Sequence, residues 1–275
     1  MNGCEPYKDL YIYLIEGKIS EGDEKDLGVA FLGNWVEDDS AFLFFSEPSR
    51  DVVDTFLKSR EELACIEEFY LSYEQWQGGV LEPIKIGPLI IVPPWVEVEP
   101  KPRETRIILD PGVVFGTGLH PTTMDCLRAL IYLKERQIRM NKVLDLGTGT
   151  GILSLVAGFL GADHVTAVDL NPLAVRTAKK NVLLNHLEEI INVIEGDAQD
   201  FVDKPVDLVM ANIHYEVIKR LFGKSDFRDK NRYIISGLMR SQIRDLKIQV
   251  SGYGFQVVQE WDHEMTWYTL LLARS

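Results

Sequence analysis

The sequence predicts an α/β fold in which a mainly parallel sheet carries helices on both faces, preceded by a small α+β domain. Two observations predict this fold. From Thr105 onwards, apolar strand segments alternate with helix-length segments, which is typical of a parallel sheet with right-handed crossovers. Before that point the sequence is typical of strands and is strongly acidic. Residues 1–75 hold 6 Lys+Arg and 18 Asp+Glu, whereas the whole chain holds 29 Lys+Arg and 42 Asp+Glu. An acidic front domain therefore precedes a nearly neutral body.

The front domain is expected to span residues 1–76. Residues 9–17 alternate as a half-buried strand does, and residues 28–46 are typical of a hairpin that turns at Glu37 to Ser40. A helix is expected from Ser49, with this serine as its cap, and residues 65–73 are expected to return as another strand. These elements make a small α+β unit.

The next segment, residues 77–104, holds five prolines between Pro83 and Pro100 and is expected to be a linker with short extended pieces. Residues 105–275 are expected to form the main domain. Its expected strands are 142–146, 164–169, 191–195, 206–211, 233–236, 255–261 and 266–273, with helices starting near Gly151, Pro172, Glu216 and Arg240. Only the sequence DHEM separates the last two strands, so they should form an antiparallel pair.

Composition limits the class of protein. The net charge of −13 argues against a general nucleic-acid binder, because a phosphate backbone favours clustered Lys and Arg. No apolar segment approaches the ~20 residues that a membrane helix needs, so a cytoplasmic protein is expected. Cys4, Cys65 and Cys126 are far apart and fit no metal-ligand pattern, which predicts reduced thiols and no metal site.

A glycine-rich turn follows the expected strand at 142–146. Gly147, Gly149 and Gly151 would let the backbone bend tightly and approach a ligand closely. The next strand ends on Asp169, 24 positions after Asp145, where a carboxylate can accept hydrogen bonds from both hydroxyls of a ribose. A nucleoside is therefore expected, although a tight strand-to-helix turn alone would also use these glycines.

The kind of nucleoside follows from the charge at the turn. A dinucleotide fingerprint needs G-x-G-x-x-G, and the positions that would complete it are Ile152 or Ser154. Asp145 lies two residues before the first glycine, where its carboxylate would repel a pyrophosphate and favour a cationic ligand. S-adenosylmethionine carries both a sulfonium and an ammonium group, so it is the expected cofactor.

This turn, followed by an acid on the second strand, resembles the class I methyltransferases, which have a Rossmann-like sheet. The stretches DPGVVFGTGLHPTT (110–123), VLDLGTGTGILSLVAGFLGADHVTAVDLNPLAV (143–175) and VDLVMANI (206–213) closely resemble the ribosomal protein L11 lysine methyltransferases. The resemblance covers roughly Ile107 to the C-terminus, and it implies that the first stretch contacts the methionine part of the cofactor. The cofactor-binding residues expected from these motifs are Phe115, Gly116, Thr117, His120, Thr123, Asp145, Gly147, Gly149, Asp169, Leu170, Asp197 and Asn212.

Several of these residues have an alternative interpretation. HPTT is also a capping sequence with Pro121 in the first helical turn, and Thr122 is the residue best explained by capping alone. His120 is expected to contact the cofactor rather than to transfer a proton. Asp197 either meets the adenine amine or is a solvated loop acid. We assign no role to His164, His186 and His263.

Asn212, in VMANIHYEV, is expected to orient the attacking amine through its side-chain amide. The common tetrapeptide of nitrogen-methylating enzymes has proline and an aromatic residue after this Asn, whereas Ile213, His214 and Tyr215 follow here, which leaves the target atom open. Tyr215 either lines the amine channel or is an ordinary half-buried tyrosine.

The resemblance implies methyl transfer from S-adenosylmethionine to a lysine amine, and also to an N-terminal amine, of a large-subunit ribosomal protein. The amine must be neutral, although the pKa of lysine in water is ~10.4, and orientation is expected to supply most of the rate. The acidic front domain is expected to dock this basic substrate, with a role in solubility as the alternative. We expect a monomer that binds neither nucleic acid nor membranes. Methylation of another protein or a small molecule, and a non-catalytic cofactor-binding regulator, stay open.

Overall fold

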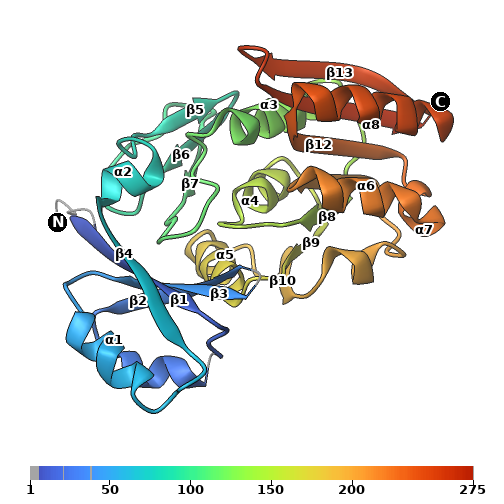
Figure 1. The fold of residues 1–275 in the computed structure, drawn as a ribbon. Helices are drawn as coiled ribbons and strands as arrows, with labels where there is room; N and C mark the ends of the chain where they lie inside the picture. Colours follow the sequence, from blue (N-terminus) through green and yellow to red (C-terminus); the bar gives the residue numbers. More distant parts are fainter. Residues whose placement is uncertain (1–5, 21, 38, 275) are drawn as a thin grey trace.

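The computed structural model describes residues 6–20, 22–37 and 39–274. The front domain is an antiparallel sheet with strand order β2-β3-β1-β4, with an α-helix and a short 3-10 helix beside it (Figure 1). Its elements are β1 (Asp9–Glu16), η1 (Asp23–Leu27), β2 (Phe31–Glu37), β3 (Ser40–Phe45), α1 (Arg50–Leu57) and β4 (Ala64–Ser72). The expected strands and helix are confirmed. Cys4, expected as a reduced thiol, and Asp38, expected in the hairpin turn, lie outside the described residues.

The predicted cap of α1 is wrong in its chemistry. Ser49 occupies the N-cap position, but its side chain makes no capping hydrogen bond. Its hydroxyl donates instead to the carbonyl of Glu47 at 2.9 Å, and its backbone N–H donates to the Tyr13 hydroxyl at 2.9 Å. The backbone N–H of Ser49 therefore links the start of α1 to β1, and its hydroxyl does not cap the helix because it donates to the preceding turn.

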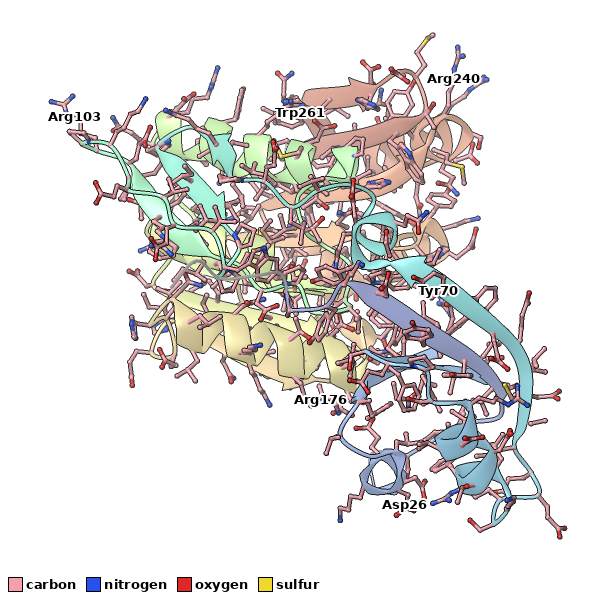
Figure 2. All side chains as sticks on the ribbon, turned by 90° about the vertical axis from the view of Figure 1, so that its left-hand side faces the viewer. Asp26, Tyr70, Arg103, Arg176, Arg240 and Trp261 are labelled. Carbon is pink, nitrogen blue, oxygen red and sulfur yellow. The ribbon has the colours of Figure 1, made fainter. Side chains whose placement is uncertain are left out.

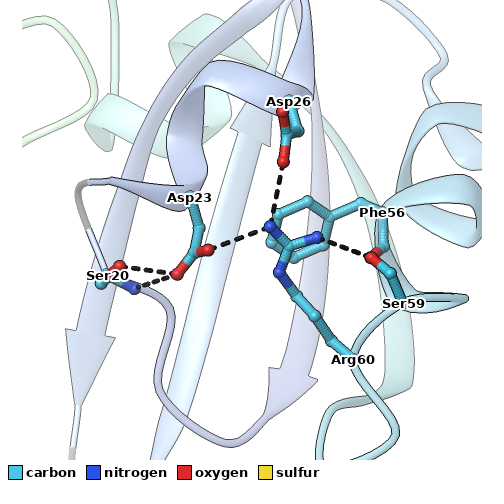
Figure 3. Close-up of polar contacts among 6 residues, drawn as sticks. All are labelled: Ser20, Asp23, Asp26, Phe56, Ser59 and Arg60. Atoms are coloured by element: carbon cyan, nitrogen blue, oxygen red, sulfur yellow. Dashed lines mark hydrogen bonds and ion pairs between the residues drawn. The ribbon is translucent and has the colours of Figure 1, made fainter.

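Part of the acidity of the front domain is neutralised internally. The Arg60 guanidinium donates to Asp23 at 2.9 Å and to Asp26 at 3.0 Å, and it stacks 3.9 Å over the ring of Phe56 (Figure 3). Ser20 donates its hydroxyl to the second oxygen of Asp23 at 2.6 Å. These contacts join η1 to the end of α1, so Asp23 and Asp26 stabilise the fold of the domain.

The segment after the front domain is folded against the body. It contains β5 (Ile84–Ile86) and β6 (Leu89–Val92), which form a three-stranded sheet with β7 (Thr105–Ile108). α2 (Tyr73–Gln77) precedes these strands and spans the expected boundary between residues 76 and 77. Ile86, Leu89, Ile91 and Ile107 are buried in the same core as the main domain. The short extended pieces are confirmed, but packing fixes them on the body.

The main sheet has the strand order β10-β9-β8-β11-β12-β14-β13, and β14 runs antiparallel to both β12 and β13 (Figure 1). Its strands are β8 (Lys142–Leu146), β9 (His164–Asp169), β10 (Ile191–Glu195), β11 (Leu208–Asn212), β12 (Arg232–Met239), β13 (Phe255–His263) and β14 (Trp267–Arg274). One core packs the sheet against α3 (Pro121–Glu135), α4 (Ile152–Phe159) and α5 (Pro172–Leu184). The other core packs it against α6 (Tyr215–Gly223), α7 (Ser225–Arg228) and α8 (Arg240–Gly252), and η2 (Ala198–Phe201) follows β10. This is the expected class I methyltransferase sheet with helices on both faces.

The bounds predicted for β8, β9 and β10 are confirmed, whereas those of the other four strands differ. β13 ends at His263 instead of residue 261, and β14 spans Trp267–Arg274 instead of 266–273. β11 spans Leu208–Asn212 instead of 206–211, and just before it the N–H of Asp207 donates to the carbonyl of Lys142 at 2.8 Å. β12 extends to Met239, since a register shift between Ile235 and Leu238 lets it continue along β14. Among the described residues, no helix is both long and apolar enough to cross a bilayer.

The front domain is packed directly on the main domain. Leu10, Ile12 and Phe44 share a buried cluster with Val113 and Leu173 of the main domain. Arg176 of α5 reaches Glu24 across the same boundary, with 3.3 Å between the guanidinium and the carboxylate, and Figure 2 shows it beside the front domain. Deleting the front domain would therefore expose apolar surface on the body.

Candidate active site

Neighbouring residues pack closely against the glycine turn that follows β8. Gly147 and Gly149 have φ of +73° and +56°, which side chains rarely adopt. A Cβ at Gly149 would lie 2.7 Å from the carbonyl oxygen of Phe115, and one at Gly147 would lie 2.2 Å from a methyl group of Ile213. Both glycines are therefore required by close approach as well as by backbone conformation.

The two glycine-containing stretches of the sequence lie against each other. Thr150 donates its backbone N–H to Phe115 at 3.2 Å and its hydroxyl to the carbonyl of Gly116 at 2.7 Å. The side chain of Phe115 stays 64% exposed, although its ring contacts Trp35 and Trp76 of the preceding region. Thr117 is buried, and its hydroxyl accepts the N–H of Leu119 at 3.3 Å. The loop thus forms a wall beside the glycine turn.

Asp145 lies buried beneath this turn, with 1% of its surface exposed. One carboxylate oxygen accepts the hydroxyls of Thr148 at 2.7 Å and Ser154 at 2.6 Å, and the other has no partner among the described residues. Burial raises the pKa of Asp145 to about 6. A buried carboxylate with an unpartnered oxygen fits a cationic group, because such a group would offset the cost of burying the charge.

Asp169 ends β9 next to the turn. Its two oxygens accept the backbone N–H groups of Gly149 and Asn171, each at 2.9 Å, and burial raises its pKa. A carboxylate has about four acceptor sites, so acceptor capacity remains on both oxygens for a diol. This arrangement fits the ribose role that we predict for Asp169.

Two further predicted residues lie at the same edge of the sheet. Leu170 is 71% exposed directly after Asp169. Asp197 follows β10, whose last residue Glu195 pairs with Asp169, and its carboxylate accepts the N–H of Gln199 at 2.9 Å as the cap of η2. The adenine role of Asp197 stays a prediction, and the cap gives its carboxylate a fixed direction.

The predicted polar residues of α3 and β11 also come together. His120 is the N-cap of α3, and its Nδ1 lies 2.7 Å from the Thr122 hydroxyl, which accepts the Asn212 side-chain N–H at 3.3 Å. The His120 ring contacts Trp267 edge to face at 5.1 Å, and burial lowers its pKa. Thr123 is buried in the same helical turn. The structure thus places Thr122, which we explained by capping alone, between two predicted site residues.

Other candidates have ordinary surroundings. Tyr215 is buried in the core under α6, which favours the packing interpretation over the amine channel. Cys65 and Cys126 carry free thiols. Within the described part of the chain, no three metal-binding side chains gather at one point.

Known proteins of similar sequence and structure identify the family of the chain. The sequence model of the ribosomal protein L11 methyltransferase (PrmA) family matches residues 71–275. The chain belongs to this family. The match includes both glycine-containing stretches, β11 with Asn212, and the C-terminal strands, and it begins at the end of β4.

Individual family members extend the similarity. The L11 methyltransferase of Geobacillus kaustophilus (strain HTA426) is 40% identical over 189 residues, which cover 65% of this chain and 59% of the relative. That of Clostridium perfringens (strain SM101 / Type A) is 34% identical over 263 residues, 91% of this chain and 78% of the relative. A crystal structure of ribosomal protein L11 methylase from Lactobacillus delbrueckii subsp. bulgaricus superimposes with a TM-score of 0.59 at 28% identity, covering 70% of this chain and 98% of that one.

Proposed function

We propose that this chain transfers methyl groups from S-adenosylmethionine to amines of a large-subunit ribosomal protein, with L11 as the substrate that the relatives' names indicate. The observation that carries the proposal is the meeting of three features at one edge of the sheet. These are a glycine turn with a buried acid beneath it, the acid Asp169 at the end of β9, and Asn212 at the end of β11. Modification of a ribosomal protein would place the enzyme in the cytoplasm, and we propose that it acts as a monomer.

Different residues would bind the cofactor and orient the substrate amine. Asp169 would hold the ribose and Asp145 would balance positive charge, while Phe115 and Leu170 offer exposed apolar surface beside them. When bound, the cofactor supplies an electrophilic methyl group on its sulfonium. The side-chain carbonyl of Asn212 would accept an N–H of the incoming amine and so direct its lone pair. Partial desolvation and the positive charge of a sulfonium next to the amine would lower the pKa of that amine and favour its neutral form.

The identity of the cofactor is a first prediction. Calorimetry should show binding of S-adenosylmethionine and S-adenosylhomocysteine but not of NAD, because the carboxylate of Asp145 would repel a pyrophosphate. Binding of NAD with no heat from the other two ligands would overturn the cofactor assignment.

The substrate would dock on the front domain. β4 is an edge strand of its sheet, and Ile66 (57% exposed) and Tyr70 (62% exposed) lie on it. The Tyr70 hydroxyl donates to the carboxylate of Asp9 at 2.9 Å, and Glu67 is an exposed acid of the same strand. Figure 2 shows Tyr70 on this strand, on the outer side of the domain. Apolar side chains among carboxylates fit a basic protein that also contributes apolar contacts. The packed boundary between the domains makes truncation a poor test of docking, so point variants on β4 are preferable.

We predict that the double variant Ile66→Lys, Tyr70→Lys lowers kcat/KM for folded L11 by about tenfold or more, because it removes apolar contact and repels a basic partner. S-adenosylmethionine affinity should stay unchanged. The control is Val29→Lys, a change of the same kind at a fully exposed residue away from β4, which should have no effect. Equal kcat/KM in the double variant and the wild type would favour a solubility role for the acidic domain.

A further inference from the structure

Thr122 occupies a central position between two predicted site residues. Its side chain is 3% exposed, and its hydroxyl lies 2.7 Å from Nδ1 of His120 and 3.3 Å from Nδ2 of Asn212. Its own carbonyl accepts the Ser236 hydroxyl at 3.3 Å, and Ser236 in turn lies 2.5 Å from the Thr269 hydroxyl. Ser236 of β12 and Thr269 of β14 therefore fix the backbone of Thr122 through its carbonyl group.

The directions of these hydrogen bonds follow from one backbone group. The N–H of Thr122 donates to Nδ1 of His120 at 3.4 Å, and a backbone N–H cannot act as an acceptor. We therefore assign Nδ1 as the unprotonated nitrogen, which places the proton of a neutral His120 on Nε2. The Thr122 hydroxyl then donates its single hydrogen to Nδ1 as well, and its oxygen is left to accept from Asn212.

This direction fixes the amide of Asn212. Only the NH₂ group of an amide can donate, so Nδ2 faces Thr122 and Oδ1 faces away from it. A Cβ at Gly237 would lie 3.2 Å from this Oδ1, so glycine at position 237 keeps the oxygen uncovered. The opposite amide orientation would require the Thr122 hydroxyl to donate to Asn212 and a protonated Nδ1 to face the Thr122 N–H.

We propose that Thr122 is a positioning residue for methyl transfer, which sets the side-chain amide of Asn212 with Oδ1 free for the substrate amine and holds His120 as the Nε2–H tautomer. This inference rests on the proposed function of the same site. Its chemical consequence is that Nδ1 of His120, which already accepts two donors, does not remove a proton from the amine.

The test compares Thr122→Val with Thr122→Ser. Valine keeps the shape but removes the hydroxyl, so Asn212 and His120 each lose a buried partner and the amide can rotate. We expect kcat to fall by about tenfold or more, the size of one lost hydrogen bond to a buried polar group, while the KM for S-adenosylmethionine changes little. Serine restores the hydroxyl and should recover most of kcat. Thr166→Val on β9, outside this network, is the matched control and should behave as wild type.

A second measurement does not depend on turnover. Nitrogen-15 NMR of His120 at a pH where the ring is neutral should show an unprotonated Nδ1 in the wild type and a mixture of tautomers in Thr122→Val. A protonated Nδ1 in the wild type, full activity of Thr122→Val, or failure of serine to restore kcat would each overturn the proposal. Absence of methyl transfer by the wild type would defeat the proposed function instead, and the NMR result would still decide the hydrogen-bond directions.

Discussion

Replacing Asp169 with alanine is expected to weaken S-adenosylmethionine binding by about 1.5–3 kcal/mol, which is the scale of lost charge-assisted hydrogen bonds. The carboxylate would accept the ribose diol while its remaining sites hold the N–H groups of Gly149 and Asn171. The variant therefore loses ligand contacts and also releases the glycine turn from β9. Calorimetric titration of purified wild-type and variant protein measures the difference directly.

The control for this change is Asp163→Ala. This variant removes an exposed acid just before the first residue of β9, whereas Asp169 is the last residue of that strand. It should bind the cofactor as the wild type does. Both variants should keep the wild-type circular dichroism spectrum. A folded Asp169→Ala protein with unchanged affinity would show that the nucleoside lies elsewhere.

Gly149→Ala is expected to weaken S-adenosylmethionine binding by a similar amount, through steric conflict and without the loss of a ligand contact. The new Cβ would lie 2.7 Å from the carbonyl oxygen of Phe115, and the φ of +56° is strained for alanine. We expect a loss of about 1–3 kcal/mol in stability and more than tenfold weaker cofactor binding, because the loop that Thr150 anchors must move away from the turn. Thermal unfolding and calorimetry measure the two effects.

Gly254→Ala separates the clash from the backbone strain. Gly254 also has a positive φ, +80°, but its Cβ would meet nothing within 4 Å, and it lies before β13 at the edge of the sheet away from the site. Its substitution should cost stability alone, about 1–2 kcal/mol, with normal cofactor affinity. If both glycine variants bound the cofactor equally well, the contact between Phe115 and the turn would not matter for binding.

The sequence predicted the main sheet well where strands are short apolar runs with clear ends. β8 ends before the glycine turn and β9 ends on Asp169, as predicted, and β10 matches the apolar run at 191–195, because buried strands of a parallel sheet are continuous apolar segments. The end of β12 was missed, since its extension depends on pairing with β14, which follows it in the chain. The cap of α1 was missed because a local turn competed for the Ser49 hydroxyl.

The sequence predicted the site residues that belong to local motifs, but not the contacts between residues that are far apart in the chain. The resemblance implied that the stretch at 110–123 contacts the cofactor, but the bonds of Thr150 to Phe115 and Gly116, which hold this stretch against the glycine turn, were not predicted. The contact between Thr122 and Asn212 joins residues 90 positions apart, and no local pattern signals it. The packing of the front domain on Val113 and Leu173 likewise depends on tertiary structure, because half-buried apolar residues in strands do not reveal their partner.

The central claim is methyl transfer to the amines of a ribosomal protein. The most direct test is intact-mass spectrometry of purified L11 after incubation with this protein and S-adenosylmethionine, followed by peptide mapping. We predict a series of products heavier by whole methyl increments, with the added groups on lysine or N-terminal amines. L11 of unchanged mass, in a reaction where the protein demonstrably binds the cofactor, would contradict the account.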